Sequence, residues 1–120
     1  MLKKEIPDTV RGLLPLSPAV FYILFALAEG EKHGYAIMKE AETVSGGQFT
    51  MGPGTLYTTI QRLLEVGLIE ETSTSSDSER RRRCYRLSRS GSQALEAELN
   101  RMDSLVRSAQ RRKLVPRDAR

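Results

Sequence analysis

One stretch restricts the fold of this 120-residue chain more than any other: GPGTLYTTIQRLLEVGLIEE, residues 52–71. Gly52 is a permissive helix cap and Pro53 suits the first helical position, whereas Gly67 suits the residue that follows a helix. The stretch therefore predicts a helix from Pro53 to Val66. At about 100° per residue, its apolar side chains gather on one side, which predicts a packed face. This face consists of Leu56, Ile60, Leu63 and Leu64.

The opposite side of the same helix carries groups that suit contacts with nucleic acid. Threonine and glutamine offer short hydrogen-bonding groups to phosphates and base edges, and arginine can fork onto guanine or a phosphate. A glycine in the first turn lets the backbone approach a phosphate at the positive end of the helix. The competing interpretation is a merely solvated face, as on most surface helices. The candidate contact residues are Gly54, Thr55, Thr58, Gln61 and Arg62.

Two further helices are predicted upstream. SPAVFYILFALAEG offers Ser17 as N-cap, Pro18 at the first helical position and Gly30 at the end, and its apolar residues on all sides predict burial. The apolar run is shorter than the roughly 20 residues that a membrane span needs, and the acidic residues and prolines before it argue against a secretory signal. HGYAIMKEAETVSGG predicts a second helix of about three turns. The only histidine, His33, precedes it and is expected to have a structural role at the helix start.

A hairpin is predicted after the third helix. LIEETST is β-compatible, SSDSE is a polar loop, and RRRRCYRL returns with Tyr85 and Leu87 on one face. Three helices followed by a hairpin is the order of a winged helix, in which the third helix enters the DNA major groove. The arginine run then lies where a wing meets phosphates, although a solvated, self-repelling loop is the alternative. The run consists of Arg80, Arg81, Arg82 and Arg83.

A last helix is predicted from Ser90 onward by an apolar stripe with spacings of four, three, four and three residues. The stripe either packs against its own domain or pairs with another chain. Together with Leu105, it provides more apolar surface than a three-helix domain needs, which favours dimerisation. The stripe consists of Leu95, Leu99, Met102, Val106 and Ala109.

Charge and cysteine content narrow the function. Nineteen Lys and Arg against fifteen Asp and Glu give a net charge of +4, which favours an acidic partner such as nucleic acid. The single cysteine, Cys84, forms no internal disulfide, and we expect a cytoplasmic protein. Because Cys84 follows Arg83, whose charge favours the thiolate, two roles are possible for it: a redox-sensing thiol or a small structural residue. No phosphate-loop, H-E-x-x-H or C-x-x-C motif occurs, so we expect no enzymatic activity, metal or cofactor.

The segments HGYAI, GTLYTTIQRLLEVGLIEE and YRLSRSG resemble the signature of the PadR-like transcriptional regulators, and the resemblance covers residues 16 to about 105. It implies a dimeric winged-helix repressor with the C-terminal helix in the dimer interface, released from DNA by a small-molecule effector. It also implies roles for particular residues. Thr55, Tyr57 and Arg62 match recognition-helix positions, Tyr85 and Leu87 match the second wing strand, and Gly91 matches the glycine that opens the last helix.

Tyr57 lies at the edge of the apolar face, so its ring is expected to pack while its hydroxyl reaches toward DNA. The chain departs from the family pattern at two places. Gly52 stands where a serine cap is common, and SRSG replaces the usual threonine, two acidic residues and glycine. The first turn of the recognition helix is therefore expected to be less firmly capped.

The expected fold is mainly α with a small β-hairpin: a winged helix-turn-helix plus a C-terminal dimerisation helix. We expect an N-terminal arm over residues 1–16 and the DNA-binding domain over 17–89, followed by the dimerisation helix over 90–113 and a basic tail over 114–120. The expected function is sequence-specific binding of double-stranded DNA by a homodimer on a two-fold symmetric operator, which represses transcription. The alternative is a winged-helix protein-interaction module with an incidental basic surface.

Overall fold

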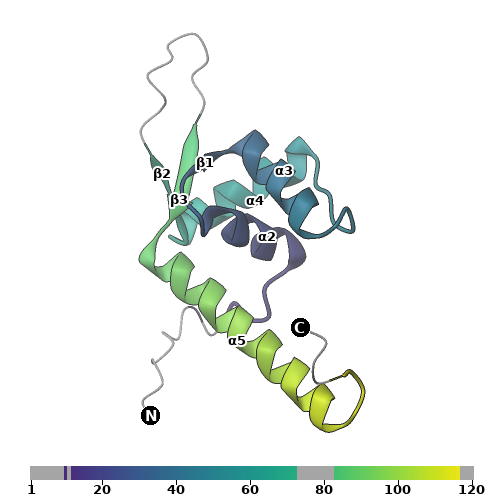
Figure 1. Ribbon diagram of the computed structural model, residues 1–120. Helices are drawn as coiled ribbons and strands as arrows, with labels where there is room; N and C mark the ends of the chain where they lie inside the picture. Colours follow the sequence, from purple (N-terminus) through teal and green to yellow (C-terminus); the bar gives the residue numbers. More distant parts are fainter. Residues whose placement is uncertain (1–9, 11, 73–82, 117–120) are drawn as a thin grey trace.

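The computed structural model describes residues 10, 12–72 and 83–116. Three helices, a hairpin and a long last helix follow one another as the sequence predicts, and Figure 1 shows their arrangement. In chain order the elements are α2 (Pro18–Leu27), β1 (Lys32–His33), α3 (Gly34–Val44), α4 (Pro53–Glu65), β2 (Ile69–Thr72), β3 (Cys84–Leu87) and α5 (Arg89–Arg111). Within the described ranges, none of these helices is long and apolar enough to cross a membrane.

The helix starts follow from local sequence. The Ser17 hydroxyl accepts a hydrogen bond from the Val20 N–H at 3.3 Å, which caps α2. His33 Nδ1 accepts from the Ala36 N–H at 3.3 Å, which caps α3 and confirms the structural role predicted for this histidine. α4 begins after Gly52, which provides no side-chain cap. The first turn of α4 therefore lacks the side-chain acceptor that caps the backbone N–H groups at the starts of α2 and α3.

The sheet is antiparallel, with the strand order β1-β3-β2. β2 and β3 form the predicted hairpin, with Thr72 opposite Cys84. On the other side of β3, Lys32 pairs with Tyr85 and His33 pairs with Cys84. β1 was not predicted, because a two-residue strand is too short for an alternating pattern to show. Its pairing ties the start of α3 to the hairpin.

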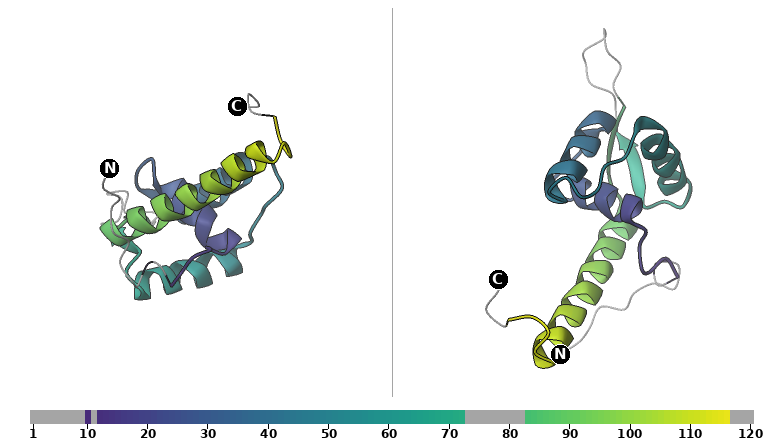
Figure 2. Two further views of the ribbon diagram at one scale, coloured as in Figure 1. Left: turned by 90° about the horizontal axis from the view of Figure 1, so that it is seen from below. Right: turned by 90° about the vertical axis from the view of Figure 1, so that its right-hand side faces the viewer.

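The core lies where the helices meet the sheet. α2 runs through its middle, in contact with α3, α4, α5 and β3 (Figures 1 and 2). α4 buries Leu56, Ile60 and Leu63, each at most 3 % exposed. Val10, from the expected N-terminal arm, is 1 % exposed and belongs to the same cluster. The described part of the arm therefore packs onto the domain.

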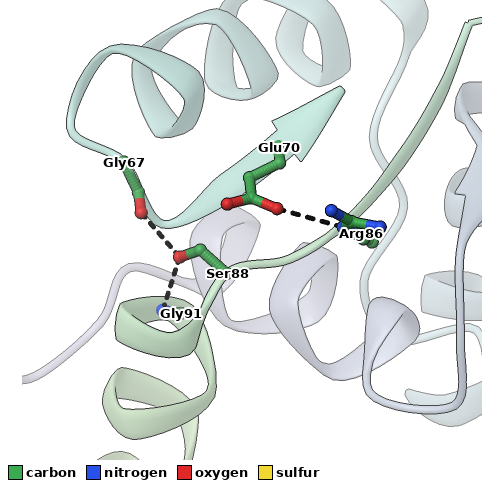
Figure 3. Close-up of polar contacts among 5 residues, drawn as sticks. All are labelled: Gly67, Glu70, Arg86, Ser88 and Gly91. Atoms are coloured by element: carbon green, nitrogen blue, oxygen red, sulfur yellow. Dashed lines mark hydrogen bonds and ion pairs between the residues drawn. The ribbon is translucent and has the colours of Figure 1, made fainter. Parts of the chain in front are cut away.

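A polar junction joins the end of α4 to the start of α5 (Figure 3). The Ser88 hydroxyl accepts from the Gly91 N–H at 3.0 Å and donates to the Gly67 carbonyl at 2.6 Å. The Ser88 N–H donates to the Leu68 carbonyl at 3.1 Å. A Cβ on Gly91 would collide with the Leu68 carbonyl oxygen and approach Leu87 Cδ2 at 3.2 Å. Because Gly91 has no side chain, the backbone of α5 can lie in contact with the Leu68 carbonyl in the turn after α4.

A second contact holds α5 to the arm through a buried carboxylate. Glu98 is 1 % exposed, and its Oε2 accepts from the Leu16 N–H at 3.0 Å. Arg101 donates from Nε to Oε1 at 2.6 Å and from Nη2 to Oε2 at 3.1 Å. The hydrogen bond from Arg101 lowers the pKa of Glu98, burial opposes it, and the Leu16 N–H adds to the lowering. The carboxylate is therefore held in its charged form.

We predict that Gly91→Ala lowers the free energy of unfolding by about 1–3 kcal/mol, because the added methyl overpacks against backbone. This loss outweighs the better helix propensity of alanine, about 1 kcal/mol. Gly54→Ala is the matched control, since a Cβ there meets no heavy atom within 4 Å. Urea denaturation compares the two variants. Equal stability changes in both would contradict the packing explanation for Gly91.

We predict that Glu98→Gln is about 1–3 kcal/mol less stable than wild type at pH 7, because the charged acceptor of two donors is lost. The folded-state pKa of Glu98 is lowered, so its stabilisation is present above the unfolded-state value and is lost as pH falls through the folded-state value. The difference between the two proteins should therefore shrink as pH falls below about 4.

Urea denaturation at pH 7, 5, 4 and 3.5 measures this difference. Glu96→Gln, at an exposed position of α5, is the control and should stay within about 0.5 kcal/mol of wild type. A difference for Glu98→Gln that is constant over the whole pH range would show that its charge does not stabilise the fold.

Candidate nucleic-acid interface

α4 presents a polar face to the surface, and the predicted division of this helix into two faces is confirmed. Leu56, Ile60 and Leu63 point into the core, and Leu64 is half-buried. The exposed residues on the other side form what we call the polar face of α4. They are Gly54, Thr55, Thr58, Gln61, Arg62 and Glu65.

The groups on this face are available to a ligand. The hydroxyl of Thr59, a half-buried neighbour, is occupied within the helix, because it donates to the Thr55 carbonyl at 2.7 Å. Thr55 and Thr58 are exposed. Among the described residues, Arg62 makes no ion pair. A Cβ on Gly54 would meet no atom within 4 Å, so the first turn of α4 is open to an approaching group.

Tyr57 links α4 to α3. Its side chain is 49 % exposed, and its phenol lies against the first residue of α3. A Cβ on Gly34 would collide with the Tyr57 hydroxyl oxygen and lie 2.9 Å from Cζ, so a larger residue here would displace the tyrosine side chain. The hydroxyl end of the side chain is the part that lies beside Gly34. That the hydroxyl reaches toward DNA stays a prediction.

The arginine run of the wing is described only at its last residue, since Arg80, Arg81 and Arg82 lie outside the described residues. Arg83 Nε lies 3.7 Å from a Glu71 carboxylate oxygen. One further arginine was missed by the sequence analysis: Arg86 donates from Nε to Glu70 at 3.0 Å (Figure 3). The strand register places Arg86 opposite Glu70. A prediction of the hairpin register from the sequence would therefore have indicated this pair.

The α5 stripe divides between the core and the surface. Leu95 is 6 % exposed and belongs to the core of its own domain. Leu99 and Val106 are 38 % and 41 % exposed, and Met102 and Ala109 are half-buried. The buried residues of α5 all lie before Leu99, and the second half of the helix extends beyond the domain (Figure 2). Self-packing therefore accounts for the start of the stripe only.

Other candidate sites are weaker. The described residues contain no group of three or more metal-ligating side chains. Cys84 is a free, half-buried thiol on β3, the central strand. A shallow depression of about 320 Å³ lies where the first half of α5 meets the end of α2 and β3. Its lining includes Ala28, Leu87, Leu95 and Leu99.

Comparison with known proteins agrees with this geometry. Residues 23–97 match the model of the transcriptional regulator PadR-like family, a region that includes α4, both hairpin strands and Gly91. An uncharacterized 37.1 kDa protein in transposon TN4556 of Streptomyces fradiae is 37 % identical over 87 residues. The alignment covers 72 % of this chain and 24 % of that protein, so the chain spans about a quarter of this relative's length.

Solved structures share the fold. Bacillus subtilis PadR in complex with operator DNA is 26 % identical with a TM-score of 0.63, covering 71 % of this chain and 47 % of that one. RosR of H. salinarum is 26 % identical with a TM-score of 0.65, covering 89 % and 96 %. A PadR family transcription regulator from Clostridium difficile R20291 is 22 % identical with a TM-score of 0.67, covering 79 % and 97 %. With the family model matched over more than half of its length, the chain belongs to the PadR-like family of transcriptional regulators.

Proposed function

We propose that this protein is a sequence-specific DNA-binding regulator that represses transcription as a homodimer on a two-fold symmetric operator. The observation that carries the proposal is the exposed polar face of α4, backed by buried Leu56, Ile60 and Leu63. A helix anchored in this way presents its polar side chains at fixed positions to a major groove. The B. subtilis PadR structure, which contains operator DNA, supports the same partner for this chain.

Within α4, base contacts and phosphate contacts are assigned to different turns. Recognition helices usually contact base edges from their N-terminal part. Thr55 and Thr58 lie there and act as base readers, with Gln61 beside them on the same face. Arg62 lies in the last turn and holds a phosphate, which contributes affinity with little selectivity. The backbone at Gly54 approaches a phosphate at the positive end of the helix.

The wing adds phosphate contacts on the flanking DNA. Arg83 and the preceding arginines of the run neutralise phosphates and release counterions, which strengthens binding to any sequence. Sequence choice therefore resides on α4, and the wing supplies general affinity. This division matches the chemistry of the two elements, because the wing offers uniform positive charge and α4 offers varied hydrogen-bonding groups.

The second half of α5 forms the dimer interface in this proposal. From Leu99 onward the α5 stripe lies at the surface, where a second copy of the chain would bury it. A small-molecule effector would act on the angle between α5 and the DNA-binding domain. The depression between α2 and α5 is the candidate position, because Leu95 and Leu99 line it at the start of the proposed interface.

We predict that Thr58→Ala folds normally, loses operator affinity and relaxes preference at one symmetric pair of base positions, by about 1–3 kcal/mol per well-made base contact. Arg62→Ala should weaken operator and variant sites nearly equally. Thr59→Ala is the matched control, since the Thr59 hydroxyl is bonded inside the helix. Titration against operator and single-base variants at fixed salt measures these changes. Unchanged affinity and preference in Thr58→Ala and Arg62→Ala would favour the protein-interaction module instead.

We predict that Leu99→Glu combined with Val106→Glu converts the dimer into a folded monomer. Each unpaired charge buried in an apolar interface costs about 3–5 kcal/mol, whereas in a single chain both side chains remain at the surface. Leu114→Glu adds a charge at a position that is 71 % exposed and outside the stripe, so this control should stay dimeric. Sedimentation at micromolar concentration reports the state. A double variant that still sediments as a dimer would place the interface elsewhere.

A further inference from the structure

In the described part of the wing, the β2–β3 hairpin, each arginine lies beside a carboxylate of β2. Glu71 faces Arg83 at 3.7 Å, with side chains 40 % and 72 % exposed. Glu70 faces Arg86 at 3.0 Å, with side chains 51 % and 61 % exposed. Glu70 and Glu71 are consecutive strand residues, so their side chains point to opposite faces of the hairpin. A carboxylate therefore accompanies an arginine on each face of the wing.

The sheet fixes the backbone that carries these carboxylates. Glu71 is paired with Tyr85 and Glu70 with Arg86 in the β2–β3 register. Tyr85 is 3 % exposed; its burial raises the pKa of its phenol, and the Glu71 charge raises it further, which places that charge near a fixed core residue. An arginine that leaves for a phosphate has a long, flexible side chain, whereas the carboxylate stays on its strand.

The energies allow these carboxylates to lower DNA affinity. An exposed ion pair contributes about 0–1 kcal/mol, so a well-placed phosphate can take the arginine from its carboxylate. The carboxylate left behind then repels phosphates within a Debye length, about 8–10 Å at moderate salt. This repulsion acts through phosphates, which are common to operator and random DNA, so it lowers the affinity for both.

We propose that Glu71, assisted by Glu70, lowers the DNA affinity of the wing by competing with phosphates for Arg83 and Arg86. The inference rests on the proposed function, and it assigns a role to two acidic residues of β2 within that function. Because phosphates are common to every sequence, this role lowers the affinity for operator and random DNA by a similar factor and leaves sequence choice to α4.

The experiment compares wild type with Glu71→Gln and Glu70→Gln, which keep the side-chain shape and remove the charge. The probes are a duplex selected by the wild-type protein from a random pool and a scrambled duplex of the same length, titrated from 50 to 300 mM KCl. For Glu71→Gln, affinity for scrambled DNA should rise about three- to tenfold, with a salt dependence steeper by about 1. Affinity for the selected duplex should rise by a similar factor, because the wing meets phosphates in both duplexes. Glu70→Gln should also raise the affinity for both duplexes.

The matched control is Asp103→Asn. Asp103 pairs with Arg107 at 2.9 Å, with side chains 41 % and 66 % exposed, on α5 rather than on the wing. Asp103→Asn changes the net charge by the same amount as Glu71→Gln. Its affinity for scrambled DNA should nevertheless stay within about twofold of wild type, because an exposed charge far from the wing is screened. An equal rise in Asp103→Asn and Glu71→Gln would overturn the inference, since net charge alone would then explain it.

Two further results separate the inference from the proposed function. If the wild-type protein selects a duplex but Glu71→Gln binds scrambled DNA no better than wild type, the inference fails and the proposed function stands. If the wild-type protein binds no DNA at 50 mM KCl, both fail. Circular dichroism of each variant confirms that the fold is kept.

Discussion

The hydroxyl of Ser88 is the point on which the arrangement of the functional elements depends. It binds the carbonyl that follows α4, at Gly67, and the backbone N–H of Gly91 in the first turn of α5. The missing side chain at Gly91 lets α5 touch the Leu68 carbonyl directly. The end of α4, the start of β2, the end of β3 and the start of α5 therefore meet at one place (Figure 3).

Carboxylates have two different roles in this fold. Glu98 is buried, its charge is satisfied by Arg101 and the Leu16 N–H, and it fixes α5 against the N-terminal arm. Glu70 and Glu71 are exposed and face arginines that they hold only weakly. These two roles follow from a difference in solvent exposure. A buried charge must keep its partners, whereas an exposed pair exchanges them at little cost, which suits a surface that meets phosphates.

Local features were predictable from the sequence, and long-range ones were not. The faces of α4 and the cap at His33 depend on residues within a few positions of each other, so periodicity and capping rules predict them. From the sequence alone, Glu98 cannot be told from the other charged residues of the helix, because its partner Leu16 is 82 positions away. Val10 in the core was hidden for the same reason, and the two-residue β1 was too short to show an alternating pattern. The α5 stripe was visible, but its division between core and surface at Leu99 depends on where the domain ends. At the candidate site, the exposed residues of α4 were predicted, whereas the pairing of Glu70 with Arg86 needed the strand register.

Sequencing the DNA that the wild-type protein retains from a random duplex pool tests the central claim most directly, because the selection itself identifies the preferred site. A homodimer that places one α4 in each of two major grooves should enrich a two-fold symmetric sequence. Its half-sites should be centred about one helical turn apart, roughly 10 base pairs, or a multiple of this distance. Retained DNA with no enriched sequence would show that α4 does not read bases. An enriched sequence without two-fold symmetry would contradict the symmetric dimer.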